Sequence, residues 1–513
     1  MTKITKNWIN RDFNDPNGLT AADIPVSQAA SIKKWLDLSG GIEPVDVGGR
    51  SIPQTVLYAS PNGIGTGESS DTPISLETLR QRFSGRKVSV LIKLVVGGEY
   101  VLDDTWVVTN GARVFIEFDT SNSTLDWVNN PPIICTAHTT ASYISYNTSD
   151  NQTCAAHNYD ETAFSVYQGR LNLQDVVLRS TSYAVTVGVA GVVYFRNHFR
   201  IEMWAPKASV NNVCYAVSAM GPGATAVFMP RGNAASFDDR CGIYMYPTEA
   251  SDQCHYYKAV AIASHANCMV YDGHLNFYSA HAIQDPSVKV DSLSVWNTAT
   301  LTMYGPIIKH TNFKCVVGGW DSVVSFGEYA TTEFVHDYDP GITDHRNPIQ
   351  NLLRISNCVV NGILGSNNTN NTHYTTGSYL NLKNSFVGIR GTFPPFAAIG
   401  TVNSGVYCNA VTGRLAPLQC VDTTYGTYNI PVFAVHSSNV MIDYENTDTV
   451  TMNGDPNSPY SAFVAAYASK LELNGNPSTP TVYHTNKQQA GLFDVLTGSE
   501  LFERASDIKL VTG

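Results

Sequence analysis

The sequence of 513 residues is poor in charge and lacks the patterns typical of nucleic-acid and membrane-surface proteins. Asp, Glu, Lys and Arg make up 15% of the chain, against about 25% in an average globular domain. The formal net charge is −11, and no run of basic residues is interleaved with aromatic ones. We therefore expect no nucleic-acid partner and no binding to an anionic membrane surface.

Paired cysteines, an export signal and a membrane span are also missing. The ten cysteines are scattered singly, without a Cys-x-x-Cys pair or the spacing of a metal site. We expect them to be buried free thiols, and we expect no metal and no cofactor. Residues 1–8 have no apolar core like that of a signal peptide, and no apolar run approaches the length of a membrane span. These absences predict folding in a reducing cytoplasm without membrane insertion.

What the sequence does contain is one short phrase, repeated seven times. The phrase is a Gly, Ser or Ala, then a variable residue, then three residues of which the outer two are apolar or aromatic. Because successive side chains of a strand point to opposite faces, each copy predicts a short strand with one buried face. The copies begin at Gly169, Gly191, Gly273, Ala299, Ser378, Ser438 and Ser469.

Longer internal matches indicate stacked coils. Residues 166–173 recur almost unchanged as residues 270–277, and residues 434–442 are echoed by residues 465–473. Neighbouring copies lie 22 (169 to 191), 26 (273 to 299) and 31 (438 to 469) residues apart. An irregular period favours a parallel β-helix over a propeller, and an ordinary β-sandwich is the alternative. Since a chain this long must elongate or divide, we predict an all-β, right-handed, single-stranded parallel β-helix, an elongated solenoid.

The chain is predicted to have four parts. The first carries turn signals and a short amphipathic helix pattern at residues 26–38. It is an arm that either caps the first coil or attaches to a larger assembly through Trp8, Phe13 and Trp35. The parts are an attachment or capping arm (1–45), the first coils with a capping helix (46–130), the β-helix body with loop excursions (131–480), and a last coil or cap (481–513).

Residues 56–102 carry a resemblance to a known family. A strand and a Gly-rich turn at residues 56–68 lead to a helix-like stretch at residues 72–79, and a Gly-Gly-Glu-Tyr bend follows at residues 97–100. This order resembles the start of the pectate-lyase-like parallel β-helix of bacteriophage tailspikes and tail fibres. The glycines of the turn do not predict a phosphate-binding loop for a nucleotide, because residues 68–73 separate them from the helix.

The resemblance implies a virion fibre or tailspike that attaches to bacterial surface polysaccharide. Such proteins are typically homotrimers, intertwined or side by side, made in the host cytoplasm without a signal peptide. An N-terminal segment joins them to other tail, baseplate or collar proteins. Three alternatives remain: a tailspike depolymerase that cleaves capsule or O-antigen, a purely structural virion fibre, and a free-standing enzyme of pectate-lyase type, which would leave the arm without a role.

Two acidic segments are the candidates for catalysis. Glycosidases use two carboxylates about 5 to 9.5 Å apart, whereas a lyase needs a base such as Tyr or His beside a cation. In an extended segment Asp337 and Asp339 would share one face, about 7 Å apart, although Asp-x-Asp-Pro-Gly is also a turn pattern. A pair of aspartates before Arg240 is the second candidate, or a surface ion pair. The candidate catalytic acids are Glu333, Asp337, Asp339, Asp238 and Asp239.

Aromatic residues follow the second acidic segment. Sugar rings pack their apolar faces on aromatic side chains while their hydroxyl groups bond to polar ones. The candidate glycan-binding residues are Tyr244, Tyr246, His255, Tyr256 and Tyr257.

Overall fold

The computed structural model divides the chain into two units, residues 1–54 and residues 55–513. The N-terminal arm, with Trp8, Phe13 and Trp35, lies outside the described residues. The described residues are 55–119, 129–144, 153–159, 162–181, 183–204, 213–230, 241–246, 256–279, 289–327, 332–336, 349–365, 373–375, 377–391, 393, 396–399, 405–418, 420–424, 433–444, 449–452, 461–475, 481–484, 490–495, 499–504 and 509–512.

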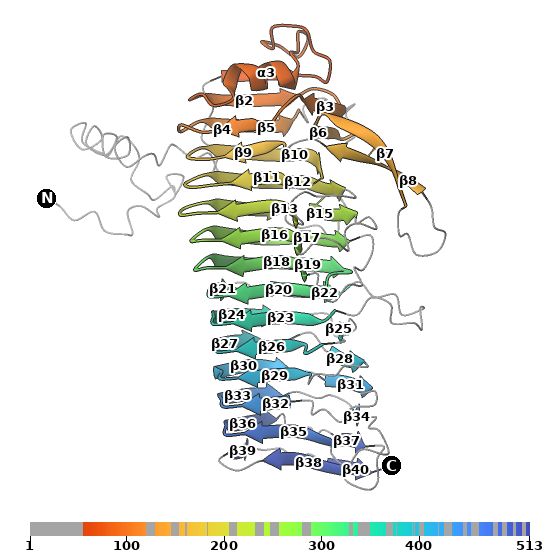
Figure 1. Cartoon of the computed structure of the whole chain (residues 1–513), viewed down its shortest axis with the longest axis vertical. Coiled ribbons are helices and arrows are strands. Elements are labelled where there is room, and N and C mark those ends of the chain that lie inside the picture. The colour runs from red at the N-terminus through yellow and green to blue at the C-terminus, as the bar shows by residue number, and fades with distance from the viewer. Residues whose placement is uncertain are drawn as a thin grey trace, which may run out of the picture. The chain divides into compact units, whose positions relative to one another are not determined.

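The second unit is a stack of β-coils, each of which adds strands to three faces (Figure 1). In one coil, β17 (Asn267–Ser279) runs along the first face and bends onto the second, and β18 (Lys289–Trp296) forms the third. The chain then starts the next coil with β19 (Thr300–Thr311), which pairs in parallel with β17 along most of its length. This arrangement confirms the predicted parallel β-helix solenoid.

The first face begins at β1 and ends at β39, and several of its strands continue onto the second face. One such bend lies between Gln174 and Val176, where the register shifts and Asp175 has a φ of 56°. Besides β17 and β19, the strands of the first face are β1 (Thr55–Ala59), β2 (Ser89–Leu94), β5 (Arg113–Phe118), β10 (Arg170–Ser180), β12 (Val192–Trp204), β14 (Thr225–Pro230), β21 (Val323–Ser325), β24 (Val359–Gly365), β27 (Phe386–Gly391), β30 (Thr412–Leu418), β33 (Asn439–Tyr444), β36 (Lys470–Gly475) and β39 (Glu500–Arg504).

The second face contains the far halves of these long strands and a run of short strands. Further along the stack it continues as a separate sheet that starts at β25 (Figure 1). Its own strands are β3 (Gly98–Leu102), β6 (Pro132–Thr136), β15 (Cys241–Tyr246), β22 (Thr332–His336), β25 (His373–Thr375), β28 (Phe396–Ile399), β31 (Cys420–Thr424), β34 (Thr449–Met452), β37 (Thr481–His484) and β40 (Lys509–Thr512).

The third face is one sheet of thirteen strands. A single antiparallel hairpin, β7 (His138–Ile144) with β8 (Thr153–Tyr159), departs from the parallel pairing of the other described strands. The strands of the third face are β4 (Trp106–Val108), β9 (Phe164–Val166), β11 (Tyr183–Val187), β13 (Val213–Met220), β16 (Tyr256–Ala263), β18, β20 (Cys315–Trp320), β23 (Asn351–Ser356), β26 (Leu380–Lys383), β29 (Val406–Asn409), β32 (Phe433–His436), β35 (Ser461–Tyr467) and β38 (Ala490–Val495).

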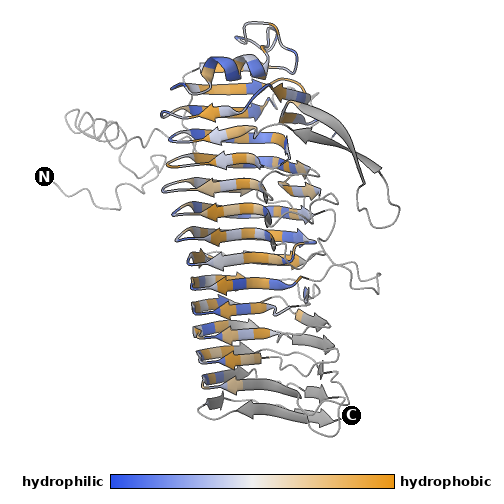
Figure 2. Cartoon of the chain, viewed as in Figure 1, coloured by the Kyte–Doolittle hydropathy of each residue, from blue (hydrophilic) through white to orange (hydrophobic). Residues whose placement is uncertain are grey.

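The core is a continuous column of inward-pointing apolar side chains. In β2 every second residue, Val90, Ile92 and Leu94, is buried, as the period of two residues in a strand requires. Figure 2 shows apolar residues recurring in coil after coil along the stack. Seven cysteines whose side chains the structure describes are free and buried, as predicted: Cys135, Cys214, Cys241, Cys268, Cys315, Cys358 and Cys408.

The corner between the third face and the first is tight, and from β20 to β35 it is built alike. From β20 onward to β35 only two residues separate the two strands, and the first of them has a left-handed backbone. Its N–H donates to a carbonyl oxygen of the next coil, as Asn384 does to Asn409 at 2.8 Å. The left-handed residues are Asp321, Asn357, Asn384, Ala410, Ser437 and Ala468, with φ between 46° and 55°.

The last corner residue points inward and is small in most coils, which explains the first position of the repeated phrase; the buried Val411 is an exception. A Cβ on Gly191 would lie 2.2 Å from the Val166 carbonyl oxygen of the preceding coil. Further along the stack the position is often serine, and the backbone N–H of Ser438 donates to Oγ of Ser469 at 3.1 Å. The Ser469 N–H donates in turn to Oγ of Ser499 at 3.2 Å.

Two copies of the phrase do not mark this corner. Gly273 lies inside β17, in register with Pro306, where the strand passes onto the second face. Ser378 precedes β26 of the third face. The number of residues in one coil therefore varies more than the sequence spacings indicated: it is 22 from Arg170 to Val192 and 42 from Thr225 to Asn267.

The described stack begins under one amphipathic helix, α3 (Leu76–Phe83). Ser75 caps its N-terminus by accepting a hydrogen bond from the Thr78 N–H at 3.1 Å. Leu76 and Leu79 are buried in the core cluster. The Gly-rich turn before the helix packs on its own chain, since a Cβ at Gly65 would lie 2.3 Å from the Thr72 carbonyl oxygen.

Candidate functional site

A row of polar and aromatic side chains lies on the outer surface of the second face. In β12, Phe199, Ile201 and Met203 point into the core, so Arg200, Glu202 and the residue after Met203, Trp204, point outward. Parallel register aligns each outward residue with one in the next coil. Glu202 is in register with Tyr244, which is in register with Tyr278, and Tyr278 with Thr311.

Part of this row, including Arg200, Tyr244 and Tyr278, lines a pocket of about 330 Å³. This volume is at the lower end of the range of small-molecule sites, about 300 to 1,000 Å³. Two of the residues that we predicted to contact a glycan, Tyr244 and Tyr246, line it. The described lining residues are Arg200, Tyr244, Tyr246, Asn276, Phe277, Tyr278, Lys309 and Thr311.

A chain of ion pairs holds Arg200 in place. Its Nε lies 2.8 Å from one oxygen of Glu202, whose other oxygen lies 2.6 Å from Nε of Arg179. Arg179 also contacts Glu99 at 3.2 Å. Burial by itself lowers the pKa of Arg200, but the charge of Glu202 and the neighbouring tyrosines outweigh it, and the pKa is raised. The guanidinium therefore stays charged at the wall of the pocket.

Aromatic rings pack around Arg200, and two of them, Tyr244 and Tyr246, line the pocket. Trp204 and Tyr246 stack with 4.3 Å between ring centroids, and the guanidinium carbon of Arg200 lies 4.3 Å from the centre of the Tyr244 ring. Nη2 of Arg200 donates to the Tyr246 hydroxyl at 3.1 Å. Burial and the charge of Glu202 raise the pKa of Tyr246. Its phenol is therefore protonated at neutral pH, so it suits hydrogen bonding and not proton abstraction.

A glycine keeps the space between Arg200 and Asn276 open. Gly242 lies between them in register, so no side chain stands there. A Cβ at Gly242 would lie 2.4 Å from the carbonyl oxygen of Asn276, which approaches the glycine closely. The Asn276 amide is held by a hydrogen bond that it donates to the Cys241 carbonyl oxygen at 3.1 Å.

Glu333, a predicted catalytic acid, lies on the same face in a later coil. It is in register with Ile307, which is in register with His274. Burial raises the pKa of Glu333, and the charge of His274 acts in the opposite direction. Four coil steps separate its strand β22 from β12 with Glu202, which is about 19 Å at ~4.8 Å a step. These two acids are too far apart to be a glycosidase pair.

The other predicted site residues have different positions. Tyr257 is fully buried in the core beneath the third face, so its prediction as a glycan contact is corrected: β16 turns this ring inward. Tyr256 lies in the same strand, but its side chain is outside the described residues. Also outside the described residues are Asp238, Asp239, His255, Asp337 and Asp339.

Sequence reasoning missed Arg200, Asn276 and Lys309. The three lie 109 residues apart along the chain, from 200 to 309, and only the register of four strands aligns them. An available signal was the alternation of polar and apolar residues in residues 199–204, which indicates an outward-facing polar row. No pattern in one sequence gives the register itself.

The described residues contain no group of three or more His, Cys, Asp or Glu side chains arranged to hold a metal ion. The helix found in the described part of the chain is eight residues long, and none there is long and apolar enough to cross a membrane.

Comparisons with known proteins return only remote likenesses. No family model matches the sequence, and no curated protein sequence matches it. Among solved structures, a GH136 lacto-N-biosidase from Eubacterium ramulus is 7% identical, with a TM-score of 0.35, over 90% of this chain and 68% of that one. PfbA, a surface adhesin of Streptococcus pneumoniae, is 8% identical, with a TM-score of 0.27, over 84% of this chain and 93% of that one. At such scores no residue role passes from these proteins to this chain.

Proposed function

We propose that this protein is a bacteriophage fibre or tailspike protein that attaches to bacterial surface polysaccharide through the tyrosine pocket of its second face. The observation that carries the proposal is the pocket itself, in which Tyr244, Tyr246 and Tyr278 meet Arg200 and Lys309. In the proposed virion the arm of residues 1–45 joins the fibre to other tail, baseplate or collar proteins, and three copies associate.

The pocket has the chemistry that sugar binding needs. Tyrosine rings offer apolar faces to the axial hydrogens of a pyranose, and their hydroxyl groups bond to its polar edge. Arg200 and Lys309 add charged donors for hydroxyl, carboxylate or phosphate oxygens. Arg200 is fixed by Glu202 before any ligand arrives, which lowers the entropy lost on binding.

Attachment without cleavage is the function that the described residues favour. The pKa of Tyr246 is raised, not lowered, so this phenol is a poor base for a lyase. Glu202 is already paired with two arginines, and it lies about four coil steps, roughly 19 Å, from Glu333. These residues therefore contain neither the base that a lyase needs beside a cation nor the two nearby carboxylates that a glycosidase needs.

A polysaccharide depolymerase is the second candidate, and Glu333 favours it. A buried carboxyl with a raised pKa is what a general acid requires. Its strand ends at His336, which is in register with His310, one residue before Thr311 of the pocket. A second acid for this mechanism would come from Asp337 or Asp339, which follow directly in the sequence.

Binding assays on pocket variants test the proposal. We expect Lys309→Ala and Tyr278→Ala each to weaken binding of host capsule or O-antigen polysaccharide by roughly tenfold, the effect of losing one strong polar or aromatic contact. Arg390→Ala, an exposed arginine of β27 on the first face, is the matched control and should bind normally.

Reducing ends and unsaturated-uronate absorbance are measured in the same samples. No cleavage product is expected. Products that disappear in Glu333→Gln would replace attachment with depolymerisation, and equal binding by the pocket variants and the control would overturn the proposed site.

A further inference from the structure

A second row of aromatic and basic side chains runs along the outer surface of the third face. Inward residues such as Val295 and Ile355 belong to the core, so the next residue in each strand points outward. Register aligns Trp296, Trp320, Ser356, Lys383, Asn409, His436 and Tyr467 in successive coils. The adjacent row contains Arg354 and Tyr407. We call the third-face strip the set Trp296, Trp320, Arg354, Lys383, Tyr407, His436 and Tyr467.

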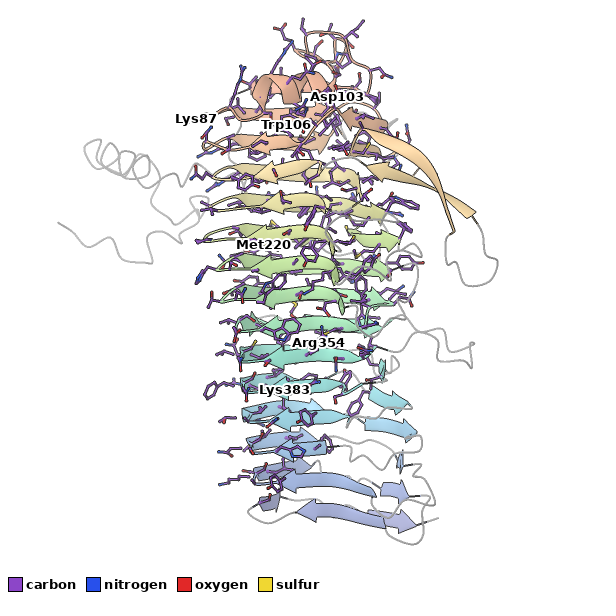
Figure 3. All side chains as sticks on the ribbon, viewed as in Figure 1. Lys87, Asp103, Trp106, Met220, Arg354 and Lys383 are labelled. Atoms are coloured by element: carbon purple, nitrogen blue, oxygen red, sulfur yellow. The ribbon has the colours of Figure 1, made fainter. Side chains whose placement is uncertain are left out.

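The rings and cations of the third-face strip lie in contact along the stack. Arg354 lies 5.1 Å from the centre of the Trp320 ring, and Lys383 lies 5.8 Å from that of Tyr407. The ring centres of Tyr407 and His436 are 5.6 Å apart, and those of His436 and Tyr467 6.3 Å. Figure 3 labels Arg354 and Lys383, which occupy the paired strands β23 and β26.

The strip is accessible at one end and anchored at the other. Tyr467 is 51% exposed and Lys383 is exposed. At the opposite end the fully buried carboxylate of Asp291 lies 2.7 Å from Arg354 and 3.5 Å from Lys258, whose Nζ lies 4.4 Å from the centre of the Trp296 ring. Gly318 leaves room for the Asp291 carboxylate and the Trp320 ring, since a Cβ added at this position would lie 3.2 Å from both. This buried cluster fixes the tryptophan rings before any ligand binds.

We propose that the third-face strip is a second glycan site, which binds an extended, anionic polysaccharide chain such as a polyuronate parallel to the axis of the stack. From Trp296 to Tyr467 the strip covers six coil steps, about 29 Å at ~4.8 Å a step. One step is close to the length that one hexopyranose unit adds to an extended chain. Successive sugars can therefore meet successive coils.

Charge favours an anionic ligand. Arg354 and the buried Lys258 share the carboxylate of Asp291, and Lys383 is an exposed cation of the strip, so with Asp321 at the adjoining corner these five groups leave an excess of one positive charge. Most of the protein has the opposite balance, with a net charge of −11. A polyanion is therefore attracted to this row, while a neutral chain gains only the contacts with the rings.

Oligogalacturonates of three and nine units are the probes, with dextran oligomers of the same lengths as neutral controls. We expect the nine-unit chain to bind more tightly than the three-unit chain and than either dextran. Lys383→Ala and Tyr467→Ala should each weaken binding of the nine-unit chain by roughly fivefold to tenfold, the range of one cation or ring contact. The matched controls, Arg390→Ala and Tyr304→Ala on the first face, should bind normally. Circular dichroism melts check that every variant is folded.

The outcomes separate this site from the tyrosine pocket. Weaker oligogalacturonate binding by Lys383→Ala and Tyr467→Ala, together with normal binding by Lys309→Ala, supports the third-face strip. This holds whether or not the pocket binds host polysaccharide. Loss only in Lys309→Ala overturns the strip and leaves the pocket standing. Absence of oligogalacturonate binding overturns it too. The strip proposal is also overturned if Tyr467→Ala changes the mass of the oligomer and leaves oligogalacturonate binding unchanged. The row would then be a contact between copies of this chain.

Discussion

The carboxyl group of Glu333 lies in surroundings that disfavour its charge. The residue is 9% exposed, and burial raises its pKa. The folded protein therefore holds the proton more tightly than the unfolded chain does. The stability that this adds is complete below the ordinary glutamate pKa of 4.5 and is lost as the pH rises through the raised value.

Glu333→Gln should therefore stabilise the protein only where the native carboxylate is charged. We expect a rise in Tm on the order of 1 °C at pH 7 to 8, because the denaturation entropy of so long a chain makes Tm shifts small. The gain should vanish toward pH 4. Thermal melts of both proteins across this range measure it, and a gain that does not vary with pH would show that the charge is not its cause.

At the scale of the element, several corners before first-face strands share one device, a buried serine. Oγ of Ser469 accepts the Ser438 N–H at 3.1 Å and donates to the Val435 carbonyl oxygen at 3.1 Å, and the side chain is buried. Water cannot replace these bonds at a buried corner. The serine hydroxyl is therefore part of the backbone hydrogen bonding between coils.

Ser469→Ala should cost about 1 to 3 kcal/mol, the usual cost of leaving a buried donor without an acceptor. Ser469→Cys should cost less, because Cys358 occupies the equivalent corner and its Sγ lies 3.3 Å from Oγ of Ser322. Urea unfolding of the two variants gives both values. Equal stability of Ser469→Ala and the native protein would mean that the corner relaxes to bond the free N–H elsewhere.

This corner also shows what the sequence could and could not predict. Small residues before an apolar alternation are visible in the sequence, and they led to the correct fold class. Gly273 has the same local pattern but lies at the bend inside β17, and Ser378 lies before the third face. Nothing local distinguishes the three settings, because the same small residue before an apolar alternation stands in all of them.

The candidate site likewise contains residues that could be predicted from the sequence and residues that could not. Tyr244 and Tyr246 could be predicted because they lie close together in one aromatic segment. Lys309 could not, because the loops between coils vary in length and the sequence does not fix which residues lie side by side. Tyr257 was misplaced because one residue along a strand decides between the core and the surface.

At the scale of the whole molecule, exposed apolar residues lie in register on the first face. Val323, Val359 and Phe386 are neighbours in successive coils and are 37%, 43% and 65% exposed. Such a row favours association of copies.

We expect light scattering to give about three times the chain mass of 55.8 kDa. Phe386→Asp should lower this mass if the row lies between copies. A monomer at every concentration would contradict the predicted homotrimer.

The corner from the third face to the first has another consequence. It spans two to four residues in every described coil from β9 onward, whereas the connection from the second face to the third ranges from two residues (181–182) to the 27 residues (137–163) that include the β7–β8 hairpin. Insertions and deletions are thus tolerated along one edge of the stack and excluded from the other. That permissive edge lies between the pocket face and the strip face, so evolution can exchange loops there and alter what the protein recognises while every coil keeps its register.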